Sequence, residues 1–198
     1  LIQGEAGTNR SAVAHISEAL GILRYLGGQY LEAVRLFKRS ANALREEVLP
    51  SCFAQGFLSR IYADWGQLDR ALDHASRVAQ VAAEKGLVDT LPYAYNHLAS
   101  VLAERGDLSR AEECFKKALV YDADVFVRSL NRVGLARCIA LGGRLSEAAL
   151  EAESALDGLG QQSLAYAYCS TIAASVLAHL AEYEKARPML EDAIRIME

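Results

Sequence analysis

The chain has 198 residues and a formal net charge of −4, and 52% of its residues are hydrophobic, which is enough apolar material for one sizeable domain or a short repeat array. Lys and Arg never occur in runs longer than a pair, which argues against direct nucleic-acid binding. No run of apolar residues approaches the roughly 20 that span a bilayer, so we expect no membrane partner either.

The hydrophobic pattern has a helical period along nearly the whole chain. Residues 1–11 precede this pattern and are predicted to be a linker or the end of a preceding element. Ala and Leu dominate and only three prolines occur, which favours helix throughout. The predicted helices span 12–27, 30–47, 51–65, 68–85, 92–105, 108–121, 125–142, 145–158, 163–180 and 183–197.

Five short turn segments separate the two members of each helix pair. They start 38, 40, 37 and 38 residues apart, which divides the chain into repeats 12–48, 49–88, 89–124, 125–160 and 161–198. Four segments begin with glycine, which can adopt the left-handed conformation that ends a helix. The segments are Gly28-Gln29-Tyr30, Gly66-Gln67-Leu68, Gly106-Asp107-Leu108, Gly143-Arg144-Leu145 and Ala181-Glu182-Tyr183.

Small residues recur at fixed distances from these turns. Seven residues before each turn lie Gly21, Ser59, Ala99, Ala136 and Ala174. Five residues after each turn lie Ala33, Ala71, Ala111, Ala148 and Ala186. Antiparallel helices approach closely only where both carry small side chains, so each pair is predicted to form a hairpin. Because a short helix cannot bury its apolar stripe alone, each hairpin needs its neighbours.

This pattern resembles the tetratricopeptide repeat (TPR) family, whose unit is a helix–turn–helix with small, Gly, Ala and aromatic residues at these intervals. The resemblance covers about residues 12–198, although the period exceeds the family's 34 residues. It implies an all-α fold, an α-α superhelix or TPR-like solenoid of five helix-turn-helix hairpins. The third repeat matches best, with Tyr95, Leu98, Ala99, Leu102, Gly106, Leu108, Ala111, Phe115 and Ala118.

The three prolines fit this register to different degrees. Pro50 and Pro92 fall where the first helices of repeats two and three begin, a position that tolerates proline. Pro188 falls inside the second helix of the fifth repeat. That helix is therefore predicted to start late or to kink.

Titratable residues do not gather in a catalytic pattern. Carboxylates such as Glu112-Glu113 and Glu151/Glu153 lie on second helices, where a solvated outer face is expected. No CxxC pair occurs and every cysteine has apolar helical neighbours, which indicates reduced core thiols in a cytoplasmic protein and no zinc site. We therefore predict no catalytic residue, no metal and no cofactor. The residues considered are Cys52, Cys114, Cys138, Cys169, His15, His74, His97 and His179.

In TPR arrays the first helix of each hairpin lines a concave groove, and the resemblance implies that exposed side chains there bind the partner. Arg60 and Arg137 hold equivalent positions, and guanidinium groups in a groove suit carboxylates, which they bind bidentately. The alternative is that these arginines only pair with Asp64 and Glu104 along the same face. The predicted partner-binding residues are Tyr25, Phe53, Arg60, Tyr93, Asn96, Ser100, Arg137, Tyr168, Thr171 and Ser175.

Three functions are compatible with such an array. The first is a protein-interaction or scaffold module that binds a protein or peptide, and the second is a sensor that closes around a small-molecule effector. A closed, aromatic-lined pocket near Phe53, Tyr93 and Tyr168 would favour the sensor, and an open polar groove would favour the peptide. The third, a helical-repeat enzyme, needs converging titratable residues that the sequence does not supply.

The chain starts at Leu1 and its helical pattern continues to Glu198, so we expect a segment of a longer protein. The long period and alanine-rich repeats resemble the sensor arrays of bacterial signalling proteins, namely signal-transduction ATPase regulators and cyclases fused to an ATPase and a repeat array. An apolar flank of the last hairpin is predicted to be exposed, which makes self-association a further hypothesis. Its residues are Val176, Leu180, Leu190 and Ile194.

Overall fold

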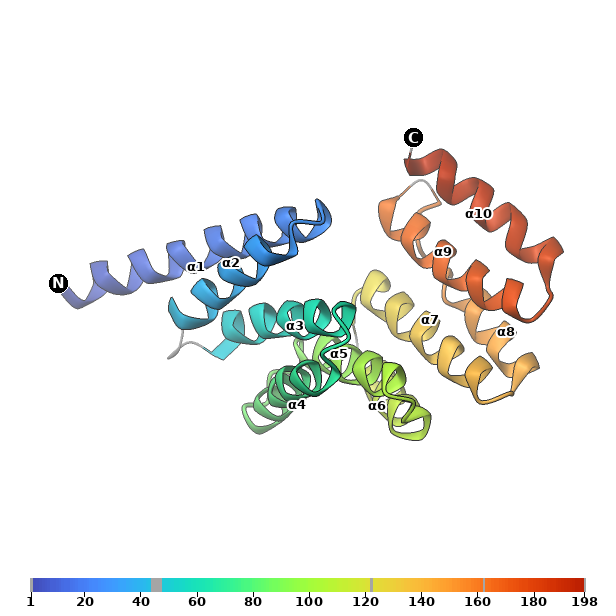
Figure 1. Cartoon of the computed structure of the whole chain (residues 1–198), viewed down its shortest axis with the longest axis horizontal. Helices are drawn as coiled ribbons and strands as arrows, with labels where there is room; N and C mark the ends of the chain where they lie inside the picture. Colours follow the sequence, from blue (N-terminus) through green and yellow to red (C-terminus); the bar gives the residue numbers. More distant parts are fainter. Residues whose placement is uncertain (1, 44–47, 122, 162, 198) are drawn as a thin grey trace. The chain divides into compact units, whose positions relative to one another are not determined.

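The computed structural model describes the backbone of residues 2–43, 48–121, 123–161 and 163–197, and the side chains in these ranges outside 2–9, 26 and 48–51. Every regular element in these ranges is a helix, which confirms the predicted all-α class. The helices (Figure 1) are α1 Ile2–Leu26, α2 Tyr30–Ala43, α3 Val48–Asp64, α4 Leu68–Glu84, α5 Leu91–Glu104, α6 Leu108–Val120, α7 Val125–Leu141, α8 Leu145–Ser154, α9 Leu164–His179 and α10 Tyr183–Met197.

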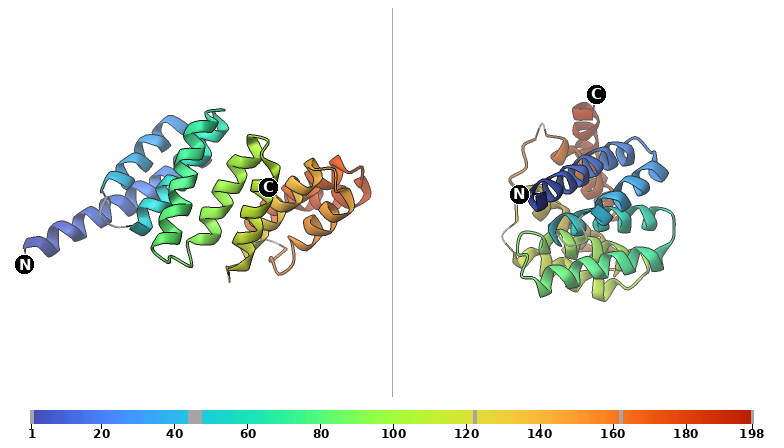
Figure 2. Two further views of the ribbon diagram at one scale, coloured as in Figure 1. Left: turned by 90° about the horizontal axis from the view of Figure 1, so that it is seen from below. Right: turned by 90° about the vertical axis from the view of Figure 1, so that its left-hand side faces the viewer.

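The chain forms two compact units, Leu1–Val101 and Leu102–Glu198. In the first unit α1 packs on α2, α2 on α3, and α3 on α4. In the second unit α6 packs on α7, α7 packs on both α8 and α9, and α9 packs on α10. The views of Figure 2 show α1 and α2 running side by side as one hairpin. Odd-numbered helices are therefore the first members of the predicted hairpins, and even-numbered helices are the second.

Each hairpin turn contains one residue in the left-handed conformation, as the turn pattern predicted. Its φ is +73° at Gly28, +71° at Gly66, +82° at Gly106, +80° at Gly143 and +61° at Ala181. The amide of this residue donates to the carbonyl three residues earlier, and the next amide donates to the carbonyl five residues earlier. This is the Schellman pattern that closes a helix end. At Ala181 the same geometry is strained, because a Cβ disfavours positive φ.

The small residues around the turns are buried, as their spacing predicted. At most 2% of the surface is exposed at Ala33, Ser59, Ala71, Ala99, Ala111, Ala136, Ala148, Ala174 and Ala186. At Gly21 a Cβ would lie 2.9 Å from Cε1 of Phe37, and at Gly134 it would clash with Cε1 of Phe115. A missing side chain thus lets an aromatic ring of the second helix pack directly on helix backbone.

Within the described residues two helix boundaries differ from the prediction by four residues or more, and the others by at most three. The helix expected to start at residue 12 begins at Ile2, because Gly4 and Gly7 weaken a helix by only about 1 kcal/mol each and no proline interrupts the segment. The helix predicted for 145–158 ends at Ser154, and the chain then turns toward Gly158, whose φ is +81°. The predicted end of the helix 30–47 lies outside the described residues.

Prolines lie where the register placed them. Pro50 and Pro92 fall in the first turns of α3 and α5, where a missing amide hydrogen removes no helical hydrogen bond. Pro188 lies inside α10, yet this helix begins at Tyr183. The late start is therefore wrong, because Pro188 removes only one hydrogen bond from the helix, and the alternative of a kink stays a prediction.

Two of the four apolar residues predicted to be exposed on the last hairpin are exposed. Leu190 and Ile194 on α10 are 37% and 54% exposed. Val176 is buried, however, and Leu180 is half-buried, because α9 turns that side toward its own neighbours in the unit. Self-association through Leu190 and Ile194 stays a prediction.

Candidate partner-binding face

All ten predicted partner-binding residues lie on first helices, and none is buried. We call their positions the first-helix face. In the first unit it carries Tyr25 on α1, Phe53 and Arg60 on α3, and Tyr93, Asn96 and Ser100 on α5; in the second it carries Arg137 on α7 and Tyr168, Thr171 and Ser175 on α9. The ring-bearing residues Phe53, Tyr93 and Tyr168 are 43%, 40% and 45% exposed. Large rings this accessible offer contact area that a partner can cover.

Tyr25 combines a structural contact with a place on this face. Its ring centroid lies 5.6 Å from that of Tyr30 and 5.9 Å from that of Phe57. Its hydroxyl donates a hydrogen bond to Oδ2 of Asp64 at 3.3 Å. The Phe57 ring also packs against Phe53, with centroids 5.0 Å apart. Phe57 and Asp64 thus support the face, although the sequence prediction gave Phe57 no role.

Both arginines of the face have carboxylate neighbours. Arg60 Nε lies 3.6 Å from Oδ1 of Asp64, one turn along α3, and Arg137 Nη1 lies 3.4 Å from Oε1 of Glu104. These are the two pairs that the alternative interpretation predicted. All four side chains are about 36–56% exposed, and exposed ion pairs contribute only about 0–1 kcal/mol. A carboxylate of a ligand can therefore replace either partner at little cost.

A shallow hollow of about 170 Å³ opens beside Arg137 in the second unit. Its remaining walls come from Ala140 and Leu141 on α7 and from Ser175, Val176 and His179 on α9. The structure thus brings two predicted residues, Arg137 and Ser175, to one place. Sequence reasoning treated His179 as an isolated side chain, but its spacing of four residues from Ser175 puts both on one side of α9.

Two hydroxyl groups of α9 donate hydrogen bonds to backbone carbonyls of their own helix. Thr171 Oγ1 donates to the carbonyl of Ala167 at 2.8 Å, and Ser175 Oγ donates to the carbonyl of Ile172 at 2.8 Å. Each oxygen keeps lone pairs that can accept a hydrogen bond. Thr171 and Ser175 therefore suit peptide amide groups better than carboxylates.

His97 packs beneath the face in the first unit. A Cβ on Gly56 would lie 2.6 Å from Nε2 of His97, so α3 and α5 approach closely at this point. Burial, and to a smaller extent the charge of Arg60, lower the pKa of His97 to about 4. His97 is therefore neutral at physiological pH and acts as a packing residue.

The remaining candidate ligands and nucleophiles are dispersed. Among the described residues no group of three His, Cys, Asp or Glu side chains is placed to hold a metal ion. The four cysteines are free and buried, as predicted, and burial raises the thiol pKa of Cys138 and Cys169 to about 11. No helix in the described ranges is both long and apolar enough to cross a membrane.

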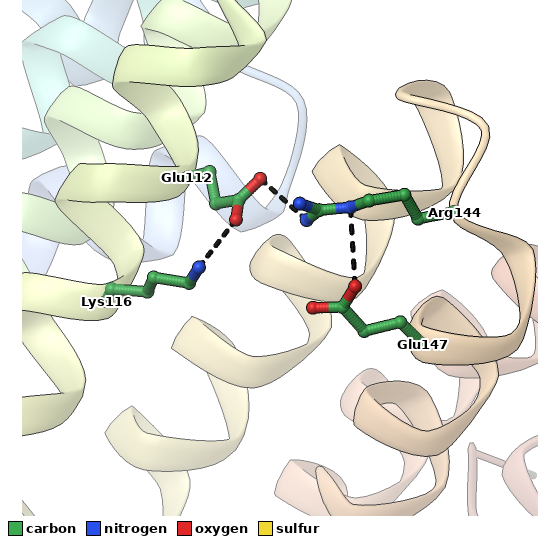
Figure 3. A network of polar contacts seen from close by, with 4 residues as sticks. All are labelled: Glu112, Lys116, Arg144 and Glu147. Atoms are coloured by element: carbon green, nitrogen blue, oxygen red, sulfur yellow. Dashed lines mark hydrogen bonds and ion pairs between the residues drawn. The ribbon is translucent and has the colours of Figure 1, made fainter.

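The carboxylates of the second helices form ion pairs between successive elements. Glu112 on α6 lies between Lys116, at 2.6 Å, and Arg144 from the turn before α8, at 2.7 Å (Figure 3). Arg144 also reaches Glu147 at 3.4 Å. A hydrogen bond from Lys116, followed by that from Arg144, lowers the pKa of Glu112. Glu112 is thus less solvated than expected, and its role is to tie α6 to the next hairpin.

Comparisons with known proteins bear on the fold. Residues 93–120 match the family model of the tetratricopeptide repeat, whereas no curated protein shows significant similarity to the chain. Among solved structures the chain is similar to BtubC (BKLC) from P. vanneervenii, with 20% identity, a TM-score of 0.67, and coverage of 95% of this chain and 81% of that one.

Two further solved structures are similar. The TPR-like repeats named for a kinesin light chain of Podosopora anserina share 18% identity, with a TM-score of 0.65 and coverage of 95% and 96% of the two chains. YrrB, a TPR protein with an unusual peptide-binding site, shares 17% identity, with a TM-score of 0.50 and coverage of 91% and 84%. These findings confirm the resemblance drawn from the repeat pattern: the chain is an all-α helical-repeat superhelix built of tetratricopeptide-like hairpins.

Proposed function

We propose that this chain is a protein-interaction scaffold that binds a partner peptide or domain on its first-helix face. We further propose that it serves as the sensor or regulatory segment of a larger cytoplasmic signalling protein and not as an enzyme. The observation that carries the proposal is that the residues which pack the hairpins differ from the residues which the first helices expose. Small buried residues hold the hairpins together, while Phe53, Tyr93 and Tyr168 expose their rings on first helices; among the described residues Tyr183 on α10 is the exposed aromatic residue of a second helix.

The exposure of the aromatic residues supports a peptide more than a small-molecule effector. A small-molecule site would enclose its ligand in an apolar pocket, whereas Phe53, Tyr93 and Tyr168 are each at least 40% exposed. The hollow beside Arg137 is open and carries a cation and an imidazole. YrrB, a similar fold, has a peptide-binding site by its own description, which supports the same class of ligand here.

The exchangeable ion pairs indicate what the partner contributes. Arg60 forms an exposed ion pair with Asp64, and Arg137 forms one with Glu104. A partner with Asp or Glu side chains can displace Asp64 or Glu104 and take bidentate hydrogen bonds from the guanidinium groups. We therefore propose an acidic segment with aromatic or apolar neighbours as the ligand.

Charge reversal on the face tests this proposal. A peptide that binds the wild-type chain is first selected from an unbiased display library, and its affinity is measured by calorimetry at pH 7.5. Arg60→Glu together with Arg137→Glu should weaken binding by about tenfold or more, because each arginine gives a charge-assisted contact. The helicity measured by circular dichroism should stay unchanged.

The matched control reverses two arginines of a second helix. Arg187 pairs with Glu191 at 2.8 Å and Arg195 with Asp192 at 3.2 Å on α10, so Arg187→Glu with Arg195→Glu changes the same charge outside the face. This control should bind the peptide as the wild type does. Equal affinity of the wild type and of the first-helix variant would contradict the assignment of the face.

A further inference from the structure

A cluster of cationic groups surrounds the ring of Tyr62 in the first unit. Lys38 Nζ on α2 lies 5.9 Å from the ring centroid, and Arg70 Cζ on α4 lies 5.8 Å from it. The ring of His74, also on α4, stacks on Tyr62 with centroids 5.3 Å apart and planes 7° from parallel. Tyr62 itself is only 5% exposed. We call Lys38, Tyr62, Arg70, His74 and Arg77 the Tyr62 cluster. The buried ring of Tyr62 lies at its centre.

This cluster lies away from the first-helix face. Successive residues of an α-helix are turned by about 100°, so Tyr62 points about 200° away from Arg60 on α3. Gln55 shares the side of Tyr62, as its spacing of seven residues requires, and contacts His74. The site is therefore separate from the one proposed for the partner peptide.

In the part of the chain that the structure describes, Lys38 lacks the acidic partner that the same position has in the third repeat. Lys116 holds the repeat position of Lys38, ten residues after the turn, and is neutralised by Glu112 at 2.6 Å. At the position of Glu112 the first repeat has Val34. Among the described residues neither Lys38 nor Arg77 forms an ion pair. Asp73 is the carboxylate whose charge acts on the same imidazole as Lys38 and Arg77.

His74 adds a hydrogen-bonding group to this charge. Its Nδ1 is bonded to Oε1 of Gln55, and because an amide oxygen only accepts, Nδ1 is the donor. In the neutral ring Nε2 is then an acceptor, and it donates to a phosphate oxygen only when His74 is protonated. Burial lowers the pKa of His74, the nearby Asp73 opposes this, and Lys38 and Arg77 lower the pKa further. The charges of both cations thus act on the imidazole of His74.

We propose that the Tyr62 cluster binds a single phosphoryl group, carried by a phosphorylated peptide segment. Lys38 and Arg70 approach one ring from two helices, and a dianion profits from several converging cations more than a single carboxylate does. A nucleic acid is disfavoured, because Tyr62 is too buried to stack with a base. The guanidinium group of Arg70 donates through Nη1 to Oε1 of Gln67 at 2.9 Å and keeps further N–H donors, and Lys38 gives a point charge.

The test uses inorganic phosphate as the first probe and the intact 198-residue chain. The imidazole resonances of His74 are followed by NMR at pH 7 while phosphate replaces chloride at constant ionic strength. They should shift saturably, and the pKa of His74 should rise when phosphate is bound. Lys38→Met with Arg70→Met should weaken phosphate binding by about tenfold or more.

Lys116→Met is the matched control, because it removes the equivalent lysine from a position that Glu112 already neutralises. This variant should bind phosphate like the wild type. Failure of the His74 resonances to saturate, or equal affinity in all three proteins, would overturn the proposal. A phosphoserine peptide that phosphate displaces would identify a protein source, whereas tighter binding of a single-stranded RNA, with the same loss in the double variant, would overturn the assignment to a peptide.

Discussion

Acidification should destabilise the first unit through His97. The folded pKa of this residue is about 4, whereas an unperturbed histidine has 6.5. When the pH falls below 6.5 the unfolded chain therefore takes up a proton that the folded chain does not accept until about pH 4. The free energy of unfolding then falls as pH falls through this window.

The two pKa values give the size of the effect. Between pH 7.5 and pH 5 the proton taken up by unfolded His97 lowers the free energy of unfolding by about 2 kcal/mol. This is an upper value, because the residue keeps some exposed surface. His97→Gln removes the titration and should reduce the pH dependence by the same amount, even if its absolute stability differs.

The chain contains one tryptophan, which makes the measurement local. Trp65 follows α3, its ring centroid lies 5.9 Å from that of Tyr62, and both belong to the first unit with His97. Urea unfolding followed by Trp65 fluorescence at pH 7.5 and pH 5 therefore reports on the correct part of the chain. His179→Gln, which removes an exposed histidine of the second unit, is the control. Equal losses of stability in the wild type and in His97→Gln would refute the reasoning.

Further substitutions test the packing by thermal unfolding. Ala181→Gly should stabilise the last hairpin by about 1 kcal/mol, because glycine adopts the positive φ of this turn without strain. Gly106→Ala should destabilise by a similar amount, because a Cβ there meets nothing within 4 Å and only the positive φ opposes it. Destabilisation by Ala181→Gly together with stabilisation by Gly106→Ala would disprove the strain. Gly134→Ala should destabilise by about 1–3 kcal/mol, and Phe115→Leu in the same chain should recover part of this loss. Glu18→Gln should stabilise at pH 7 but not near pH 4, because burial raises the pKa of Glu18 and the carboxylate is costly only when ionised.

The sequence predicted the hairpins well because their determinants are local. A left-handed residue at each turn and small residues at fixed distances from it follow from backbone sterics within one repeat. Ala181 occupies the same position as the turn glycines, and the structure gives it the same positive φ. The start of α1 was missed because Gly4 and Gly7 looked like a linker, although they do not interrupt a helix.

Contacts between side chains of different helices were less predictable. The pairs of Arg60 with Asp64 and of Arg137 with Glu104 could be anticipated, because one is a helical neighbour and the other follows from the repeat register. The Tyr62 cluster could not be anticipated, because Lys38 and His74 come from different repeats and no run of basic residues in the sequence indicates it. Their proximity depends on how α2 and α4 each pack on α3.

The central claim is that a partner covers the first helices and not the second. A photo-crosslinking amino acid placed at Tyr93 or Tyr168 on the first-helix face, or at the exposed Val120 or Leu150 on second helices, tests it directly with the peptide selected by display. The account predicts crosslinks to the peptide from Tyr93, Tyr168 or both and none from Val120 and Leu150. Crosslinks from the second helices alone would contradict it.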